Sequence, residues 1–541
     1  MTHMVLISVA VLTEALKNGS DRRIYSPEWF IDLHFRLSRR APPLRTPARS
    51  PTLLLGDPMA QQRMLTFVTI EQEMPEKRAA PTRKADFHEI YADYIAAKAN
   101  QQSSRCSQCG VPFCQQHCPL GNNIPDWLML TANGRLEEAY EISAATSNMP
   151  EVCGRICPQD RLCEGGCVIE QSGHGTVTIG AVERYITDTA WEKGWVRPIK
   201  PMRDLKQSVG IIGAGPAGLS AADQLRSAGY KVTVYDRHDR AGGLLIYGIP
   251  NFKLEKDIVD RRTKRLEDGG VKFRLGVDVG KDISLAELRA KHDAILIATG
   301  VYQSRELAAP GARATGVHKA LDYLIASNRV GLGLSAPDFE NGLLNAAGKN
   351  VVVIGGGDTA MDCVRTAVRQ GAKSVTCLYR RDRTNMPGSQ REVANAEEEG
   401  VRFDWLAAPR AVLEKKGGVA KAVRSIRMRL GPADASGRQA PEEIANSDYD
   451  VKADMVIKAL GFDPEDLPAH FDETSLSVNR WGGVKIDHRT MMTSMDGVFA
   501  AGDIVRGASL VVWAIKEGRD AAASIELYLA AKVAAARVAA E

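Results

Sequence analysis

The sequence has no long hydrophobic run near its start and no large excess of one charge. The longest clean apolar run in that region, residues 5–12, is too short to span a bilayer, and no Lys or Arg precedes it as in a secretory signal. Lys and Arg number 70 against 66 Asp and Glu, and a net charge of +4 over 541 residues is too small for a nucleic-acid-binding surface. These absences predict a cytoplasmic protein whose partners are neither membranes nor nucleic acids.

Cysteine is scarce outside one segment. Eight of the ten cysteines lie between Cys106 and Cys167, and only Cys363 and Cys377 lie elsewhere. Ten cysteines could suggest a secreted disulfide framework, but the crowded eight precede nucleotide-binding signatures of intracellular type. Metal ligation therefore explains them better.

The spacing of these cysteines favours iron–sulfur clusters. Cluster ligands converge from compact loops, and a proline prevents a helix from carrying the next ligand away. Structural zinc is the competing interpretation, but spacings of three and four residues favour redox metal. Eight thiols allow two four-iron clusters. The order is Cys106-x2-Cys109-x4-Cys114-x3-Cys118-Pro, then Cys153-x3-Cys157-Pro-x5-Cys163-x3-Cys167.

The chain is too long for one hydrophobic core, so three or four domains are expected. Residues 1–58 carry an Arg- and Pro-rich stretch at 39–51 and no sustained period. This predicts an extension outside the ordered domains, with the natural start near Met59 or Met64. We expect an α-helical cluster domain over 59–200, a first nucleotide domain formed by 201–305 and 455–541, and a second over 306–454.

Two strand–turn–helix–strand patterns predict two dinucleotide-binding units of the doubly wound α/β class. In the first, Gly213 permits a tight turn, Gly215 lets the backbone approach a pyrophosphate, and Gly218 allows close packing of helix on strand. Pro216 suits the first helical turn, and Asp236 ends the second strand, where a carboxylate accepts bonds from ribose hydroxyls. A glycine turn without a ligand is disfavoured because the pattern is complete.

The second unit differs where the first has its acid. Its second strand ends in Arg380 and Arg381, with Arg383 close behind. A guanidinium can bind a 2′-phosphate that a carboxylate would repel, so this site should prefer NADPH over NADH. The alternative is a solvated run of charges. The predicted contacts in the turn of this unit are Gly355, Gly357, Asp358, Thr359 and Ala360.

Three further strings carry a resemblance to a known family. They are Gly-Gly-Leu at 242–244, AILIATG at 294–300 and GVFAAGDIV at 497–505. From about residue 208 to its end, the chain resembles the flavoprotein reductases with two dinucleotide-binding domains. The resemblance implies FAD in the first domain, which the C-terminal segment completes, and NADPH in the inserted second domain. The FAD contacts that it implies are Gly243, Leu244, Thr299, Gly300, Gly502 and Asp503.

The cysteine segment carries a more specific resemblance. The strings RKADFHEIY, RCSQCGVPFCQQHCPLGNNIPDW and CGRICPQDRLCEGGCV, which start at residues 83, 105 and 153, resemble the small (beta) subunits of bacterial NADPH-dependent glutamate synthases. Dihydropyrimidine dehydrogenases have cluster domains of the same kind. The resemblance implies one [4Fe–4S] cluster on Cys106, Cys109, Cys114 and Cys167. It implies another on Cys118, Cys157, Cys163 and the carboxylate of Glu183, with Cys153 outside both.

The same resemblance implies an electron-input subunit. NADPH would reduce FAD, and the clusters would carry electrons to an FMN-containing large subunit that makes L-glutamate from L-glutamine and 2-oxoglutarate, in a hetero-oligomer. Hydride transfer is the chemistry of the cofactors, so no side chain of this chain is expected to be catalytic.

Two kinds of alternative remain open, and a third, the flavin disulfide reductase, is excluded. The chain could be the flavin and iron–sulfur subunit of a dihydropyrimidine dehydrogenase or of a ferredoxin-linked NADPH oxidoreductase. A flavin disulfide reductase needs a Cys-x4-Cys or Cys-x2-Cys pair inside the flavin domain, and the sequence has none there. A non-enzymatic redox sensor would use its clusters only to respond to oxidants, and catalytic dye reduction by NADPH would exclude it.

Overall fold

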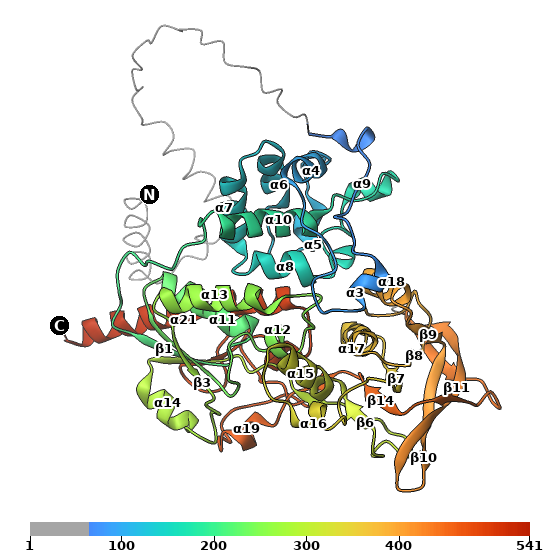
Figure 1. Cartoon of the computed structure of the whole chain (residues 1–541). Helices are drawn as coiled ribbons and strands as arrows, with labels where there is room; N and C mark the ends of the chain where they lie inside the picture. Colours follow the sequence, from blue (N-terminus) through green and yellow to red (C-terminus); the bar gives the residue numbers. More distant parts are fainter. Residues whose placement is uncertain (1–63, 436, 541) are drawn as a thin grey trace. The chain divides into compact units, whose positions relative to one another are not determined.

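The computed structural model describes residues 64–435 and 437–540, which fall within one compact unit, Gln61–Glu541. The predicted extension over residues 1–58 lies outside the described residues. Figure 1 shows blue and teal helices first, followed by two sheet-containing parts in green to red. None of the helices in the described ranges combines the length and apolarity that a membrane crossing requires.

A helical domain comes first, as predicted. Its core encloses Trp127, Val182 and Ile186, which have no exposed surface. Pro125 and Pro150 lie in the first turns of two of its helices, where the N–H that proline lacks would have no partner anyway. The elements are η2 (Thr66–Val68), α3 (Ala80–Arg83), α4 (Ala96–Ser103), α5 (Phe113–His117), α6 (Ile124–Ala132), α7 (Leu136–Thr146), α8 (Pro150–Ile156), η3 (Gln159–Arg161), α9 (Val168–Gln171) and α10 (Ile179–Glu192).

The first nucleotide domain is built on a parallel five-stranded sheet in the order β16-β4-β1-β2-β3. Its central strands are buried and strongly apolar, as strands covered on both faces must be. The edge strand β16 comes from near the C-terminus and pairs with β4, so this segment contributes to the first sheet. The elements are β1 (Ser208–Ile212), α11 (Pro216–Ser227), β2 (Lys231–Asp236), α12 (Leu244–Tyr247), α13 (Lys256–Asp268), β3 (Lys272–Leu275), α14 (Leu285–Lys291), β4 (Ala294–Ile297), β16 (Val498–Ala500), α20 (Asp503–Arg506) and α21 (Val511–Ala540).

The second nucleotide domain repeats the pattern with the sheet order β6-β14-β7-β8-β9, also parallel. The two doubly wound sheets that the sequence predicts are therefore confirmed. The elements are β6 (Val317–Lys319), α15 (Ala320–Gly331), α16 (Pro337–Glu340), β7 (Asn350–Ile354), α17 (Asp358–Arg369), β8 (Ser374–Tyr379), α18 (Gln390–Glu398), β9 (Arg402–Trp405) and β14 (Met455–Lys458).

The strand β14 corrects one predicted boundary. The sequence analysis assigns Met455–Lys458 to the first nucleotide domain, but Ile457 pairs with Val353 of β7 and with His318 of β6. The strand therefore belongs to the second sheet. A four-residue apolar strand has no mark of the sheet that it joins, because both sheets offer it the same buried surroundings.

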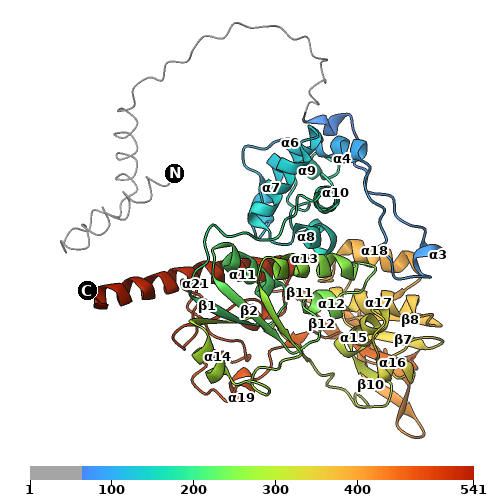
Figure 2. The ribbon, with the colours of Figure 1, turned by 60° about the vertical axis from the view of Figure 1, so that its left-hand side comes forward.

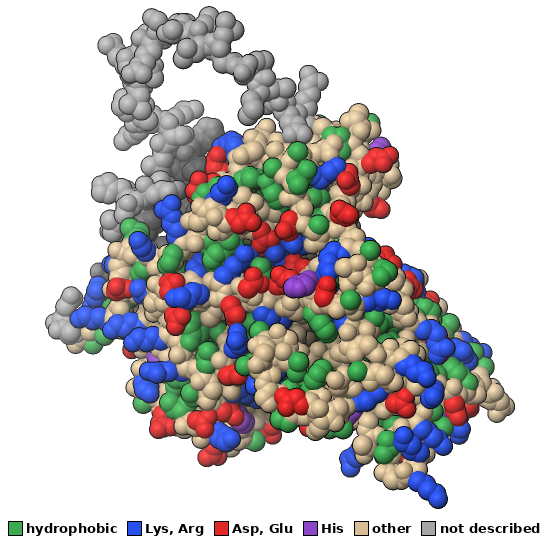
Figure 3. Space-filling view, in the orientation of Figure 1, with side chains coloured by type: hydrophobic (Ala, Val, Ile, Leu, Met, Phe, Trp, Pro, Cys, Tyr) green, Lys and Arg blue, Asp and Glu red, His purple; other side chains and the backbone are tan. Residues whose placement is uncertain are grey.

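An antiparallel sheet that the sequence analysis does not predict is inserted before β14. It consists of β10 (Ala407–Lys415), β11 (Val419–Ala433), β12 (Gln439–Glu443) and β13 (Tyr449–Lys452). Figure 3 shows Lys and Arg side chains gathered over this part of the molecule. Several of them are paired, as Arg424 is with Asp450 at 2.9 Å. Two shorter strands, β5 (Gln303–Ser304) and β15 (Phe462–Asp463), pair with each other, and α19 (Leu467–His470) follows.

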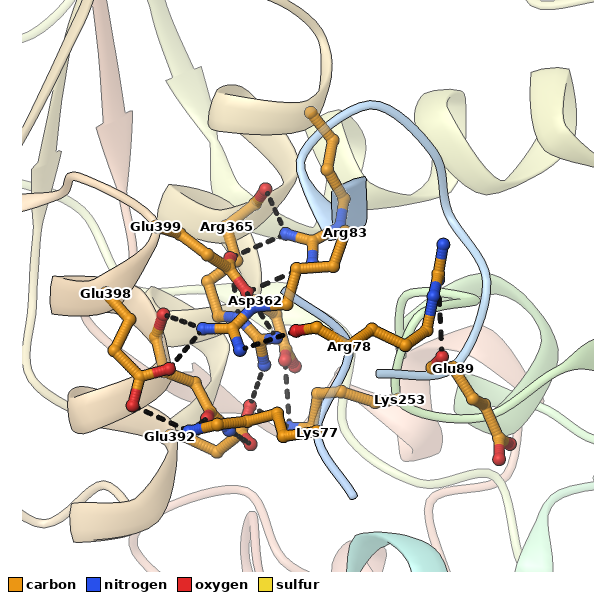
Figure 4. Close-up of polar contacts among 12 residues, drawn as sticks. Lys77, Arg78, Arg83, Glu89, Lys253, Asp362, Arg365, Glu392, Glu398 and Glu399 are labelled. Atoms are coloured by element: carbon orange, nitrogen blue, oxygen red, sulfur yellow. Dashed lines mark hydrogen bonds and ion pairs between the residues drawn. The ribbon is translucent and has the colours of Figure 1, made fainter. Parts of the chain in front are cut away.

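The segment around α3 extends from the helical domain to the second nucleotide domain (Figure 2). Arg83, only 1% exposed, donates from Nε to Glu399 Oε1 at 2.9 Å and from Nη2 to Glu398 Oε2 at 2.6 Å (Figure 4). Glu399 also pairs with Arg365 and Arg369 at 2.9 and 2.7 Å. Burial opposes ionisation of Glu399, but hydrogen bonds from Arg369 and Arg365 outweigh it and lower its pKa to about 2. One buried carboxylate thus holds three guanidinium groups together.

Candidate functional site

The turn after β1 has the geometry of a phosphate-binding loop. Gly213 has φ of +108°, and a Cβ there would collide with the carbonyl oxygen of Ala298. A Cβ at Gly218 would collide with the carbonyl oxygen of Gly213, so the start of α11 lies directly on the strand. At Gly215 a Cβ would meet nothing within 4 Å, which leaves open space for a ligand. Each glycine has the environment that its predicted role requires. Pro216 is the first residue of α11, as predicted.

Asp236 lies at the end of β2 beside this turn and is 8% exposed. Its Oδ2 accepts from the N–H of Ala214 at 2.7 Å, and its Oδ1 accepts from the N–H of His238 at 2.8 Å. The carboxylate therefore fixes the turn, a role that the sequence analysis does not predict. Each oxygen keeps another lone pair, so the carboxylate can still accept from a ribose hydroxyl.

The pocket beside Asp236 contains buried polar atoms that have no partner among the residues that the structure describes. They are Thr299 Oγ1 and His238 Nε2. Buried polar groups are normally satisfied, so these two indicate that a ligand completes the pocket. The ring of His238 lies 5.6 Å from that of Tyr247 and 5.7 Å from that of Tyr302. Neither His238 nor Tyr302 is in the predicted site, and the position of His238 two residues after Asp236 is the one signal in the sequence.

The other predicted flavin contacts come from distant segments. A Cβ at Gly243 would lie 2.9 Å from Gly215 Cα, and one at Gly502 would lie 3.0 Å from Ala217 Cβ. Gly243 immediately precedes α12, whose first residue is Leu244, and Gly300 follows Thr299 at the end of β4. Burial raises the pKa of Asp503, the first residue of α20, to about 7. The fold thus brings the 242–244 turn and the 502–503 turn onto the start of α11.

The second turn has the same construction. Gly355 has φ of +147°, and a Cβ there would collide with the carbonyl oxygen of Ala459. A Cβ at Gly357 would meet nothing within 4 Å. Asp358, Thr359 and Ala360 begin α17, and Ala360 is fully buried where the first unit has Gly218.

The arginines at the end of β8 are not equivalent. Arg383 pairs with Glu397 at 2.9 Å. Arg380 is exposed, Arg381 is half-buried, and neither guanidinium has a partner among the residues that the structure describes. The Nε of Arg381 is buried without an acceptor. Two free guanidinium groups beside a phosphate-binding turn fit a 2′-phosphate, whereas Arg383 is already engaged.

The clustered cysteines line two separate cavities. One is lined by Cys106, Cys109, Cys114 and Cys167. The other is lined by Cys118, Cys153, Cys157, Cys163 and Glu183. The fold therefore brings together the two interleaved sets that the resemblance implies, and that they hold clusters stays a prediction. Within residues 64–435 and 437–540, no three His, Cys, Asp or Glu side chains lie close enough to share a single metal ion. A four-iron cluster instead surrounds itself with ligands on separate irons.

Two side chains, Glu183 and Cys153, are candidates for the fourth ligand of the cluster predicted in the second cavity. Glu183, 8% exposed, accepts from Asn122 Nδ2 at 3.4 Å and from Ser143 Oγ at 3.3 Å, and no cation in the described part of the chain pairs with it. Burial raises its pKa to about 8. A buried carboxylate without a cation is costly, and iron would supply the missing positive charge. The thiol of Cys153 lies near the Ser147 hydroxyl at 3.8 Å and has no comparable need.

Cys363 and Cys377 lie in the core of the second nucleotide domain and are fully buried. The thiol of Cys377 donates to the carbonyl oxygen of Gly355 at 3.3 Å. Both thiols are enclosed by the apolar core of this domain, as is usual for cysteines with a structural role.

The match to known families follows these parts. Residues 83–195 match the family described as dihydropyrimidine dehydrogenase domain II, 4Fe–4S cluster. Residues 207–518 match the pyridine nucleotide-disulphide oxidoreductases. Among solved structures, FprA from Mycobacterium tuberculosis in complex with NADPH has a TM-score of 0.52 and 20% identity, covering 62% of this chain and 86% of that one. This likeness shows the fold.

Curated relatives are much closer in sequence. The glutamate synthase [NADPH] small chain of Azospirillum brasilense is 65% identical over 88% of this chain and 98% of its own length. A putative glutamate synthase [NADPH] small chain from Cereibacter sphaeroides is 56% identical over 87% of this chain and 98% of its own length. These identities confirm the resemblance seen in the cysteine segment, and the chain belongs to the family of NADPH-dependent glutamate synthase small chains.

Proposed function

We propose that this chain is the NADPH-oxidising, electron-input subunit of a glutamate synthase. It would bind NADPH in the second nucleotide domain, FAD in the first, and two [4Fe–4S] clusters in the helical domain. A large subunit would use the electrons to make L-glutamate from L-glutamine and 2-oxoglutarate. The observation that carries the proposal is the pair of cysteine-lined cavities beside a domain with the geometry of an FAD site.

The packing supports an order for the two cavities. Cys157, in the second cavity, belongs to the same buried core as Ala217 of α11 and Leu245 of α12, and Val512 of α21 lines that cavity too. Cys106, in the other, belongs to the core of the helical domain. The Cys157 cavity is thus the inner one, next to the flavin domain, and the Cys106 cavity is the outer one.

The side chains of this chain bind and orient, and the bound groups supply the redox chemistry. When bound, FAD would supply hydride chemistry with NADPH and one-electron chemistry with the clusters. Asp236 would hold the ribose end of the flavin nucleotide, and Arg380 with Arg381 would hold the 2′-phosphate of NADPH. The outer cavity would face the partner.

The second candidate function is an electron-input subunit for a different acceptor. It is favoured by the match of residues 83–195, because the description of the matched family names dihydropyrimidine dehydrogenase. Chains of this construction could deliver electrons to another acceptor. The acceptor, and not the input chemistry, separates the two candidates.

The test is to purify the chain with and without a candidate large subunit. We expect flavin, roughly eight irons per chain, NADPH-driven dye reduction by the chain alone, and glutamine-dependent NADPH oxidation only with the large subunit. Glutamate formation by the chain alone would refute the division of labour, and dye reduction without any gain from the large subunit would favour the second candidate.

A separate prediction concerns coenzyme choice. Replacing Arg380 and Arg381 by alanine should lower kcat/KM for NADPH, because each charge-assisted bond is worth about 1.5–3 kcal/mol, roughly tenfold to a hundredfold. Activity with NADH should change little, since NADH has no 2′-phosphate. Steady-state dye reduction measures both. Arg383→Ala is the control, because Glu397 already engages that guanidinium. Equal losses with both coenzymes would contradict the assignment.

A further inference from the structure

A short stretch of chain, residues 387–391, lies on the second dinucleotide turn. We call it the covering segment. The N–H of Gly388 donates to the carbonyl oxygen of Gly356 at 2.9 Å, and the N–H of Ser389 donates to Asp358 Oδ1 at 3.0 Å. A carboxylate at the start of a helix that has no other hydrogen-bond donor can accept from the free N–H groups of the first turn. It then competes for the N–H groups that a pyrophosphate needs. By holding Asp358, the covering segment leaves that helix start available.

The covering segment is itself held from the helical domain. Asp160 accepts from the hydroxyl of Ser389 at 3.2 Å and from the N–H of Gln390 at 3.2 Å. Arg161 donates to the carbonyl oxygen of Pro387. Each of these bonds joins residues more than two hundred positions apart, so they connect two domains and not neighbouring turns of one.

A second set of hydrogen bonds holds the far end of the covering segment. Arg391 donates from Nη2 to Glu164 Oε2 at 2.7 Å and from Nη1 to Gln159 Oε1 at 3.3 Å. Glu164 is 2% exposed, and its other oxygen accepts from the N–H of Gly180 at 3.0 Å. Gly180 lies in the first turn of α10, the helix that carries Glu183. Of the residues that hold the covering segment, Gln159 itself lines the inner cavity.

The residues that hold the covering segment lie between two predicted cluster ligands or directly after the second of them. Gln159, Asp160 and Arg161 form η3, between Cys157 and Cys163, and Glu164 directly follows Cys163. Both cysteines line the inner cavity. The loop between the two cysteines is thus connected by hydrogen bonds, through the covering segment, to the turn that would hold the coenzyme.

We propose that Asp160 and Glu164 are positioning residues of the pyridine-nucleotide site, although they belong to the helical domain and touch no coenzyme. They hold the covering segment on the Gly355–Asp358 turn and so raise the affinity for NADP(H). Because coupling between two sites is reciprocal, bound NADP⁺ in turn holds the loop between Cys157 and Cys163 in place. The inference rests on the proposed function of the second nucleotide domain.

The test is calorimetric titration of the purified, cofactor-loaded protein with NADP⁺. Asp160→Ala should raise Kd about fivefold or more, in the usual range of such couplings, while Asp160→Asn, which keeps an acceptor oxygen, should restore part of the affinity. Ser389→Ala removes the hydroxyl bond to Asp160 but leaves the bond from the N–H of Gln390. Its Kd should therefore rise by less, and the double variant should bind little worse than Asp160→Ala alone. Glu138→Ala, which removes an exposed carboxylate of the same domain, is the control.

A second readout checks the reciprocal effect. NADP⁺ should slow the release of iron to a chelator from the unaltered protein and should not slow it in Asp160→Ala. A merely structural role for Asp160 would change the rate of iron release without changing its response to NADP⁺.

Asp160→Ala that retains flavin and iron and binds NADP⁺ as tightly as the unaltered chain would overturn the proposal. If that variant loses its cofactors, Ser389→Ala decides, and an unchanged Kd there overturns the proposal equally. Failure of the unaltered protein to bind NADP⁺ at all would instead count against the proposed function.

Discussion

Replacing Glu399 by alanine is expected to lower the free energy of unfolding by about 3–5 kcal/mol, the cost of breaking a buried ion pair from one side. Arg83, Arg365 and Arg369 all bond to this carboxylate, and the Arg83 and Arg365 guanidinium groups are buried with it. Without it, three positive charges would remain close together in the interior. Urea unfolding, followed by circular dichroism, measures the change.

Glu397→Ala is the matched control, because this residue lies two positions earlier in an exposed pair with Arg383. Exposed pairs contribute about 0.2–1 kcal/mol, so the control should unfold almost as the unaltered chain does. Equal effects of the two substitutions would show that the buried charges at Glu399 are compensated in another way.

Replacing Glu183 by alanine is expected to remove the inner cluster, so that the iron content falls from roughly eight to roughly four per chain. The reason is that this carboxylate is buried among Cys118, Cys157 and Cys163, and no cation within residues 64–435 and 437–540 balances it. NADPH should then still reduce the flavin, but dyes that accept electrons from the clusters should be reduced far more slowly. Iron analysis, electron paramagnetic resonance and dye reduction measure these effects.

Two cysteines in the same cavity provide the controls. Cys157→Ala should lose the same cluster, whereas Cys153→Ala should keep both, because the resemblance places Cys153 outside the ligand sets. If Glu183→Ala keeps both clusters with unchanged spectra and Cys153→Ala loses one, the fourth ligand is the thiol and the assignment of Glu183 is wrong.

Short sequence patterns predicted the features that depend on local backbone geometry, which are the glycine turns and the alternation of strands and helices. The glycines at 213, 215 and 218 indicate a turn because only a residue without a Cβ fits the positive φ at the first position and the close contact at the third. The alternation of apolar strands and helices likewise predicts two parallel sheets. The strand–turn–helix–strand unit that begins each sheet spans only about thirty residues.

Sequence patterns did not reveal the features that depend on distant segments meeting. The pairing of Met455–Lys458 with the second sheet and the inserted antiparallel sheet are of this kind. So is the buried Nε2 of His238, which has no partner in the described part of the chain. A buried strand has the same composition in either sheet, and a polar side chain gives no sign of which distant group it will face.

The sequence by itself determined that this chain has two dinucleotide-binding units and a cysteine segment with the spacing of iron–sulfur ligands, because each is encoded in short, contiguous motifs. The resemblance implies how the cysteines divide into two sets. Only the tertiary structure decided which set lies in the inner cavity, next to the flavin domain, and that the loop after Cys157 holds the covering segment on the second turn. The physical reason is the same in both cases. Ligand sets and contacts between domains are formed by residues far apart in the chain, and their convergence is a property of packing that no local pattern carries.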